Sequence, residues 1–178
     1  MMKLLLHCCC APCSIESVKQ FQYEYDVTLF WYNPNIHPFT EYKARLNCLK
    51  EYASHENIKL FVIDFYGLRY FINNINGDFN GRCNFCYFSR LLSTAKYAKL
   101  KGFDAFSTTL LYSPYQNHEK IRSIAQDFSL KFNVFFAYKD IRPFFRIGQD
   151  KARKLNLYMQ KYCGCIFSEQ ERYIKKAW

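Results

Sequence analysis

The most informative stretch of this chain is Leu4-Leu5-Leu6-His7-Cys8-Cys9-Cys10-Ala11-Pro12-Cys13. Its first part, Leu4 to His7, is short, continuous and apolar, which predicts a buried strand. Four thiols follow within six residues, where we expect the strand to turn into a helix. Open α/β sheets place their chemistry at such turns. One or two buried cysteines would be ordinary small core residues, so a run of four indicates a functional loop.

The rest of the chain alternates between strand-like and helix-like patterns. We expect further strands at residues 27–32, 60–63, 103–107 and 132–136, and helices at residues 14–23, 39–55, 67–75, 85–101 and 117–128, with a mainly helical end. Ser14 and Asn117 are the expected N-caps. Alternating strands and helices predict an α/β fold, a mainly parallel sheet covered by helices on both faces. The length suits one domain, so we expect residues 1–178 to form a single catalytic domain.

Polar and reactive residues follow the predicted strands. Thiols come after the first strand, Asn33 to His37 after the second, Asp64 after the third, and Ser107 to His118 after the fourth. The carboxyl ends of parallel strands share one edge of the sheet. These residues are therefore expected to line one pocket.

The chain has nine cysteines, and seven of them fall in three clusters: Cys9, Cys10 and Cys13; Cys83 and Cys86; Cys163 and Cys165. Cys48 stands alone on a predicted helix and is expected to be a core thiol. The N-terminal apolar run is too short for a signal peptide, and no stretch approaches the length of a membrane span. We therefore expect a cytoplasmic protein, in which clustered thiols stay reduced and bind metal or react. Three clusters far apart in sequence predict one convergent site.

The net charge of +10 is concentrated near the C-terminal end. Residues 139–178 hold ten Lys or Arg against four Asp or Glu, a net +6. A basic region of this kind is typical of proteins that bind a polyanion such as a nucleic acid. A solvated basic face has the same composition, so charge alone does not choose between the two.

Three kinds of thiol site compete. Cys10-Ala11-Pro12-Cys13 at a strand-to-helix turn is typical of thioredoxin-like redox proteins, but the tryptophan usual before the first cysteine is absent and five clustered cysteines stay unexplained. A structural zinc site would use the four thiolates of the second and third clusters and leave out those after the first strand. An iron-sulfur cluster beside a second metal accounts for all seven thiols.

Five motifs together resemble the cobalamin-independent epoxyqueuosine reductases, the QueH family. They are His7 with Cys9-Cys10-Ala-Pro-Cys13; Tyr32-Asn-Pro-Asn-Ile-His-Pro38 followed by Glu41-Tyr42 and Arg45; Arg82-Cys83-x-x-Cys86-Tyr87 with Arg90-Leu91; Phe106-Ser-Thr-Thr-Leu-Leu-x-Ser-Pro-Tyr-Gln-x-His118; and Tyr162-Cys-Gly-Cys165. The resemblance spans nearly the whole chain in unchanged order. Cys8 fills a position that varies in the family and Met159 stands where the family pattern has a basic residue, and neither lies in the core motifs. The order of elements is Rossmann-like and resembles the ATP pyrophosphatases of the nucleotide alpha-hydrolase architecture, but the first strand ends in cysteines instead of a phosphate-binding turn, so we predict no use of ATP.

The resemblance implies a reaction and its cofactors. The reaction is reductive removal of the epoxide oxygen of epoxyqueuosine at the tRNA anticodon wobble position, which gives queuosine. The implied cofactors are a 4Fe-4S cluster and an additional mononuclear iron. The implied partners are tRNA carrying epoxyqueuosine and an external electron donor, with no membrane. A competing function from another class is a zinc-stapled RNA-binding module, or a thiol redox protein, without epoxide chemistry.

Roles for individual residues follow as hypotheses from the same resemblance. The metal ligands are expected to come from Cys9, Cys10, Cys13, Cys83, Cys86, Cys163 and Cys165. Contacts with the nucleoside are expected from Asn33, Asn35, His37, Ser107, Thr109, Tyr115, Gln116 and His118. His37 or Tyr115 is the expected proton source, and Arg82 and Arg90, together with the basic C-terminal part of the chain, are expected to bind phosphate. For each histidine, a structural hydrogen bond is an equally good alternative.

Overall fold

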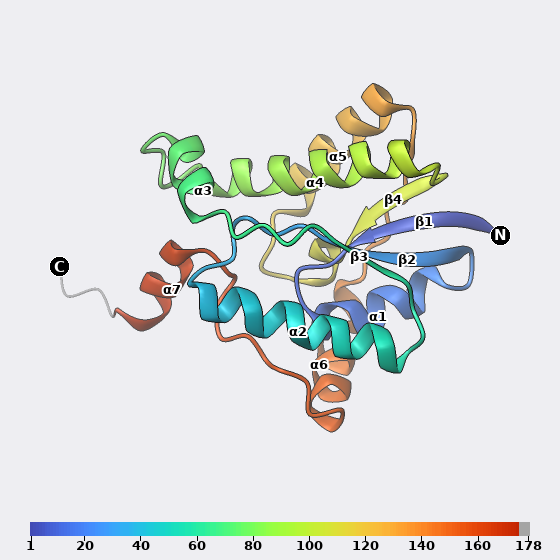
Figure 1. Cartoon of the computed structure of the whole chain (residues 1–178), viewed down its shortest axis with the longest axis horizontal. Helices are drawn as coiled ribbons and strands as arrows, with labels where there is room; N and C mark the ends of the chain where they lie inside the picture. Colours follow the sequence, from blue (N-terminus) through green and yellow to red (C-terminus); the bar gives the residue numbers. More distant parts are fainter. Residues whose placement is uncertain (175–178) are drawn as a thin grey trace.

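The computed structural model describes residues 1–174. Within them, one sheet of five parallel strands has the order β3-β2-β1-β4-β5 (Figure 1). The strands are β1 (Met2–His7), β2 (Tyr25–Trp31), β3 (Leu60–Val62), β4 (Ala105–Thr108) and β5 (Phe135–Phe136). The apolar run at residues 4–6 is fully buried, which places β1 at the centre. The predicted α/β fold with a parallel sheet is confirmed.

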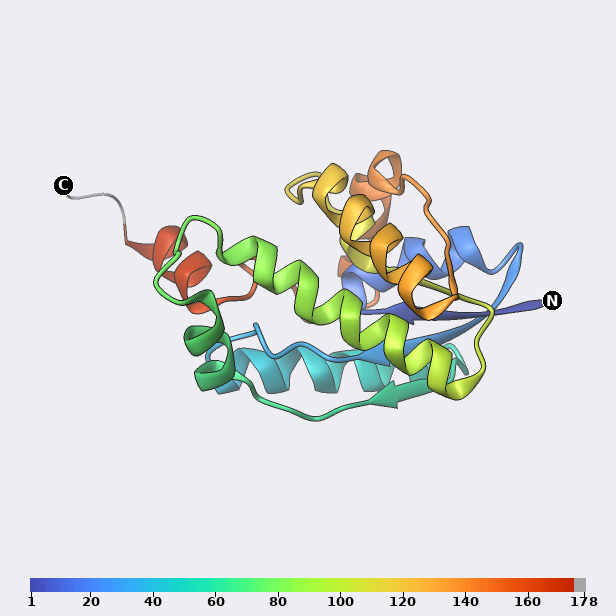
Figure 2. The same cartoon turned by 90° about the horizontal axis from the view of Figure 1, so that it is seen from above.

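Helices cover both faces of the sheet, as the sequence predicts (Figures 1 and 2). One face packs against α4 (Arg82–Lys101) and α5 (His118–Phe132), and the other against α1 (Ala11–Phe21) and α2 (Phe39–His55), while α6 (Phe145–Lys154) packs on α1. Side chains of β1 alternate between these layers, with Leu5 on the α4 side and its two leucine neighbours on the α1 side. None of the helices in residues 1–174 is both long and apolar enough to span a lipid bilayer.

The carboxyl edge of the sheet carries the shorter elements. Helices α3 (Leu68–Ile75) and α7 (Ile166–Tyr173) lie beyond this edge in both views, and the 3-10 helices η1 (Thr109–Tyr112) and η2 (Arg142–Phe144) follow β4 and β5. Strand β1 pairs with β2 on one side and with β4 on the other, so the chain reverses its winding at β1. The loops after β1 and β4 therefore open a crevice at this point, where open α/β sheets bind ligands.

The helix after β1 begins earlier than the sequence predicts. Ser14 was the expected N-cap, but α1 starts at Ala11 with Cys10 in the N-cap position. Proline at the second helical position has the backbone angle that a first turn requires, and the Ser14 hydroxyl donates to the Cys10 carbonyl at 2.8 Å. Cys13 consequently lies in the first turn of α1. The other expected cap, Asn117, is confirmed, because its side chain accepts from the Lys120 N–H.

Candidate metal centre

Three thiols meet at the carboxyl end of β1. The Sγ atoms of Cys9, Cys10 and Cys13 all lie within 4.8 Å of one another, and those of Cys9 and Cys10 are 3.9 Å apart. They come together because the loop passes directly from the strand end into the first turn of α1. Elsewhere in residues 1–174 no other set of three Cys, His, Asp or Glu side chains brings its ligand atoms this close.

The surroundings of the three thiols favour ionisation of one thiol, that of Cys9, and disfavour ionisation of the other two. Hydrogen bonds from Cys10 and Cys13 hold the pKa of the Cys9 thiol well below its usual range, and the Arg90 charge adds to this effect. Burial raises the pKa of Cys10, and the pKa of Cys13 is raised chiefly by its hydrogen bond to Cys10. Ionising all three thiols requires a positive charge between them, because buried thiolates repel one another. A metal ion provides that charge, so the triad fits a metal site.

His7 holds the start of this loop in place. Asn33 Nδ2 donates to the Cys8 carbonyl at 2.9 Å, which directs Asn33 Oδ1 toward His7 Nε2 at 3.2 Å. The His7 Nε2–H therefore donates, and Nδ1 accepts from the Thr108 hydroxyl at 3.0 Å. Burial lowers the pKa of His7 to about 4, so the ring is neutral. His7 and Asn33 thus join three strand ends beneath the triad.

The second and third cysteine clusters also meet. Cys86 on α4 and Cys165 at the start of α7 belong to one buried cluster with Phe71 and Ile75. Burial raises the pKa of Cys86 to about 12, and the charges of Cys163, Cys165 and Cys83 raise it further. The fold therefore places the pair on α4 beside the pair before α7, as the convergence prediction requires.

Arg90 lies between these two groups of thiols. Its Nη2 is 2.7 Å from the Sγ of Cys86, and its Nε donates to the Cys86 carbonyl at 3.0 Å. The side chain is 2% exposed, and its charge also acts on Cys9 and Cys163. Arg90 was expected to contact a phosphate of the RNA. In the structure its guanidinium instead faces thiols from all three clusters.

Arg45 belongs to one of the motifs without a predicted role, yet it fixes the third cluster. It donates to the carbonyls of Cys163 at 2.9 Å and Tyr162 at 3.0 Å. Its Nε donates to Glu41 at 2.7 Å, and this carboxylate also accepts from the Tyr158 hydroxyl. The signal in the sequence was a Glu and an Arg four residues apart on a helix face that also carries Leu49 and other core residues, because an unpaired charge would be costly there.

His37 fixes the same turn from the other side. The Ile166 N–H donates to Nδ1 at 3.3 Å, so Nε2 carries the proton and donates to the Pro34 carbonyl at 3.0 Å. The His37 N–H donates to the Gly164 carbonyl at 2.8 Å, and burial lowers the pKa of the ring to about 4. Both ring nitrogens are therefore occupied. This geometry matches the structural alternative and leaves no free N–H for a substrate.

A cavity of about 630 Å³ opens over the triad. It is lined by Cys9, Cys13 and Cys163 from the thiol clusters, together with Arg90, Thr109, Leu110, Ser113, Tyr115, Gln116, Phe145, Arg146, Gln149, Asp150, Arg153, Gln160, Lys161 and Tyr162. Gln116 Nε2 is 3.4 Å from the Sγ of Cys163, and Gln160 Nε2 is 3.6 Å from that of Cys13. Thr109 Oγ1 is 3.3 Å from the Cys9 N–H and 3.6 Å from its sulfur. This cavity therefore links the first and third clusters.

Of the residues expected to contact the nucleoside, Thr109, Tyr115 and Gln116 line the cavity. The other five expected contacts are buried in the protein interior. Asn33, Asn35, His37, Ser107 and His118 are buried, and Ser107 donates to the Ala137 carbonyl at 2.8 Å while His118 Nε2 lies 3.1 Å from the Ser113 carbonyl. Arg82 donates to Glu171 and to the Phe79 carbonyl, both at 2.6 Å. The lining residues that belong to no sequence motif are Phe145, Arg146, Gln149, Asp150, Arg153, Gln160 and Lys161. Only the basic composition of their region indicated a role.

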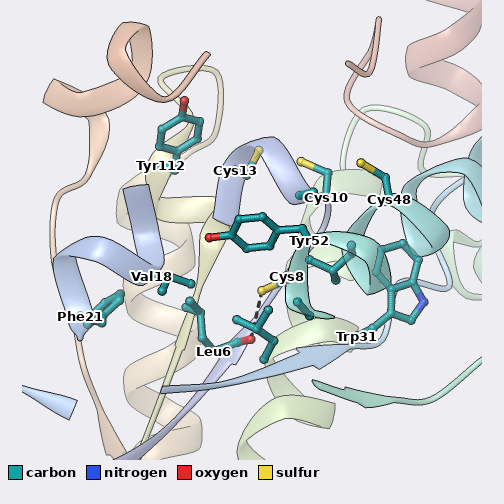
Figure 3. Close-up of a cluster of buried hydrophobic side chains, with 14 of the residues drawn as sticks. Leu6, Cys8, Cys10, Cys13, Val18, Phe21, Trp31, Cys48, Tyr52 and Tyr112 are labelled. Carbon is teal, nitrogen blue, oxygen red and sulfur yellow. Dashed lines mark hydrogen bonds between the residues drawn. The ribbon is translucent and has the colours of Figure 1, made fainter. Parts of the chain in front are cut away.

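Cys8 and Cys48 stand apart from the seven clustered thiols. Both are buried among apolar side chains (Figure 3), and the Cys8 Sγ points to the Leu6 carbonyl at 3.3 Å. Burial raises the pKa of Cys8 to about 12, which keeps it a protonated core thiol. The prediction that Cys48 is a core thiol is confirmed.

Comparisons with known proteins identify the family of this chain. The family Epoxyqueuosine reductase QueH matches the chain over residues 4–171. A protein from Dehalococcoides mccartyi with the same name is 38% identical over 174 residues, covering 97% of this chain and 96% of the relative. A protein of the same name from Thermotoga maritima is 33% identical, and the match covers 98% of this chain and 94% of the relative. Another from Acinetobacter baylyi is 34% identical, and the match covers 93% of this chain and 80% of the relative. The chain therefore belongs to the epoxyqueuosine reductase QueH family.

Proposed function

We propose that this chain removes the epoxide oxygen of epoxyqueuosine in tRNA, giving queuosine and water. The observation that carries the proposal is the triad of Cys9, Cys10 and Cys13 beneath a cavity that Cys163 also lines. A volume of about 630 Å³ is within the range of small-molecule sites, so a nucleoside can enter. Membership of the family supports the reaction.

We propose that the seven clustered cysteines hold a 4Fe-4S cluster and an additional iron. A cluster takes four thiolates, so seven thiols exceed its needs and leave ligands for another ion. When bound, such a group supplies electrons and a Lewis-acid site for the epoxide oxygen. Arg90 and Arg45 are buried cations whose charges act on Cys9, and they offset part of the negative charge that several thiolates bring together.

The reaction needs two electrons and two protons, and the oxygen leaves as water. An external donor supplies the electrons. Tyr115 lines the cavity and is 84% exposed, so its hydroxyl exchanges protons with solvent and is our proposed proton donor. Thr109 and Gln116 already bond to cysteines, and we propose that they orient the nucleoside at the thiols.

The test is an anaerobic reaction of the purified protein with tRNA carrying epoxyqueuosine and a chemical reductant. Mass spectrometry of the digested nucleosides measures queuosine. We expect conversion by the wild type and by Cys48→Ala, whose thiol lies outside the clusters, and none by Cys13→Ala. Colourless protein that holds zinc, binds tRNA and converts nothing would support the zinc-stapled RNA-binding module instead.

A further inference from the structure

We propose that the opening of the cavity is an RNA-binding rim formed by Tyr115, Arg146 and Lys161. In this proposal the two cations bind backbone phosphates on either side of the reacting nucleoside, and the Tyr115 ring stacks on a neighbouring unpaired base. The inference rests on the proposed function, because it assumes that the nucleoside reaches the cavity as part of an RNA strand. It places the phosphate contacts on two residues of the basic C-terminal part and not on Arg82 and Arg90.

The charges at this opening are free to meet an anion. Arg146 and Lys161 are exposed, and neither has a carboxylate within salt-bridge distance among residues 1–174. Asp150 is the acidic residue of the lining, and Arg153 pairs with it at 2.8 Å. Some other basic residues of the C-terminal part are paired, such as Lys151 with Glu16, whereas Lys154 and Arg172 are exposed and have no salt bridge among residues 1–174. Arg146 and Lys161 therefore leave two unpaired positive charges at the opening itself.

The Tyr115 side chain, the aromatic residue of the rim, is supported by packing against a second aromatic ring. Tyr115 meets the ring of Phe145 edge-on, with centroids 5.8 Å apart and an interplanar angle of 84°. Phe145 is anchored in turn, because the Tyr112 hydroxyl donates to its carbonyl at 2.6 Å and the two rings lie 5.1 Å apart. The Tyr115 ring is 84% exposed. A supported ring whose surface faces solvent is the arrangement on which unpaired bases stack.

Three separate segments build this opening. Tyr115 lies in the loop between η1 and α5, Arg146 lies in the first turn of α6, and Lys161 precedes the Cys163 turn. Cys9 and Cys13 line the same cavity. A strand that crosses the rim therefore places one nucleoside over the thiols while its neighbours remain on the rim. This geometry requires an unpaired loop, because stacked bases in a duplex cannot enter the cavity.

The first experiment measures binding of a fluorescently labelled anticodon stem-loop RNA by anisotropy at several salt concentrations. The Arg146→Gln/Lys161→Gln double variant is compared with Lys99→Gln/Lys101→Gln, which removes two exposed charges at the far end of α4 (Figure 2). We expect the rim variant to bind at least 10-fold more weakly and its salt slope to fall by about 1.5, since each phosphate contact contributes about 0.7 to 0.9. The control should bind like the wild type. Equal binding by the rim variant and the wild type, or equal losses in both variants, would overturn the proposal.

The second experiment separates the ring of Tyr115 from its hydroxyl. Tyr115→Phe keeps the ring and should bind the stem-loop like the wild type, whereas Tyr115→Ala should bind roughly 5-fold or more weakly. Equal affinity of Tyr115→Ala and Tyr115→Phe would contradict stacking, and so would equal binding of a fully paired RNA of the same length. Binding does not require turnover. A wild type that converts no substrate refutes the proposed function, while rim variants that bind normally refute only the rim.

Discussion

The guanidinium of Arg90 donates a hydrogen bond from Nη2 to the Sγ of Cys86 across 2.7 Å. The two residues lie one turn apart on α4, and both are buried. The same guanidinium lines the cavity with Cys9 and Cys163. One buried cation is thus shared by thiols that come from three distant parts of the chain.

Replacing Arg90 should weaken metal retention. Burial already raises the pKa of Cys86 to about 12, and the Arg90 charge opposes that rise. Arg90→Gln therefore makes the thiolate harder to form, whereas Arg90→Lys keeps the charge and should lose less. Metal content after dialysis against a chelator measures the effect, with Arg122→Gln, at an exposed position on α5, as the control. Full retention by Arg90→Gln would show that the guanidinium does not stabilise the ligand.

Replacing Arg45 should destabilise the fold. Arg45→Met leaves the buried Glu41 without the partner that lies 2.7 Å away, and breaking a buried ion pair in this way costs about 3–5 kcal/mol. The Arg45→Met/Glu41→Gln double variant removes the unpaired charge and should lose clearly less. Urea unfolding of both variants gives the free energies. A double variant no more stable than the single one would mean that the bonds to the Cys163 turn dominate.

The stability should fall in mild acid. Burial, with the Arg90 charge as the next cause, lowers the pKa of His7 to about 4, while a histidine in the unfolded chain titrates near 6.5. Between these values the unfolded state binds more protons, so lowering the pH favours unfolding. His7 alone should remove about 2 kcal/mol between about pH 7.5 and about pH 5.

Urea unfolding at the two pH values checks this histidine effect. His37 should contribute in the same direction, because its pKa is also lowered to about 4 by burial. In His7→Gln the difference in unfolding free energy between the two pH values should shrink by the contribution of His7, about 2 kcal/mol. This holds whatever the absolute stability of the variant. A pH dependence identical to that of the wild type would mean that His7 titrates in the folded protein as it does in the unfolded chain.

The periodicity of the chain was sufficient to predict the layers of the fold. Leu4 to Leu6 identified the central strand, and the spacing along residues 39–55 matched α2 from end to end. The start of α1 was misplaced because Ser14 is a good capping residue in isolation. In the structure the Ser14 hydroxyl instead donates to the Cys10 carbonyl one turn earlier in the chain. Average capping preferences do not predict this bond.

The candidate site was predictable only in part. Thiol clusters are rare, so the three clusters stood out in the sequence. The chain order and the sheet topology then predicted that they would converge. The roles of Arg45 and Arg90 depend on which side of a helix meets another segment, and Arg45 reaches carbonyls more than a hundred positions away. Arg146 and Lys161 belong to no motif. Their position at the cavity depends on how α6 and the Cys163 turn pack.

The most direct test of the account is the metal content of the anaerobically purified protein, measured as iron, zinc and acid-labile sulfide on the sample whose visible spectrum is recorded. We expect brown protein with about four sulfides and more than about four irons per chain. Cys8→Ala and Cys48→Ala should keep that content, and Cys10→Ala and Cys165→Ala should lose much of it. Colourless protein with about one zinc per chain, and no cluster after reconstitution, would contradict the central claim that the three cysteine clusters form one iron-dependent redox site.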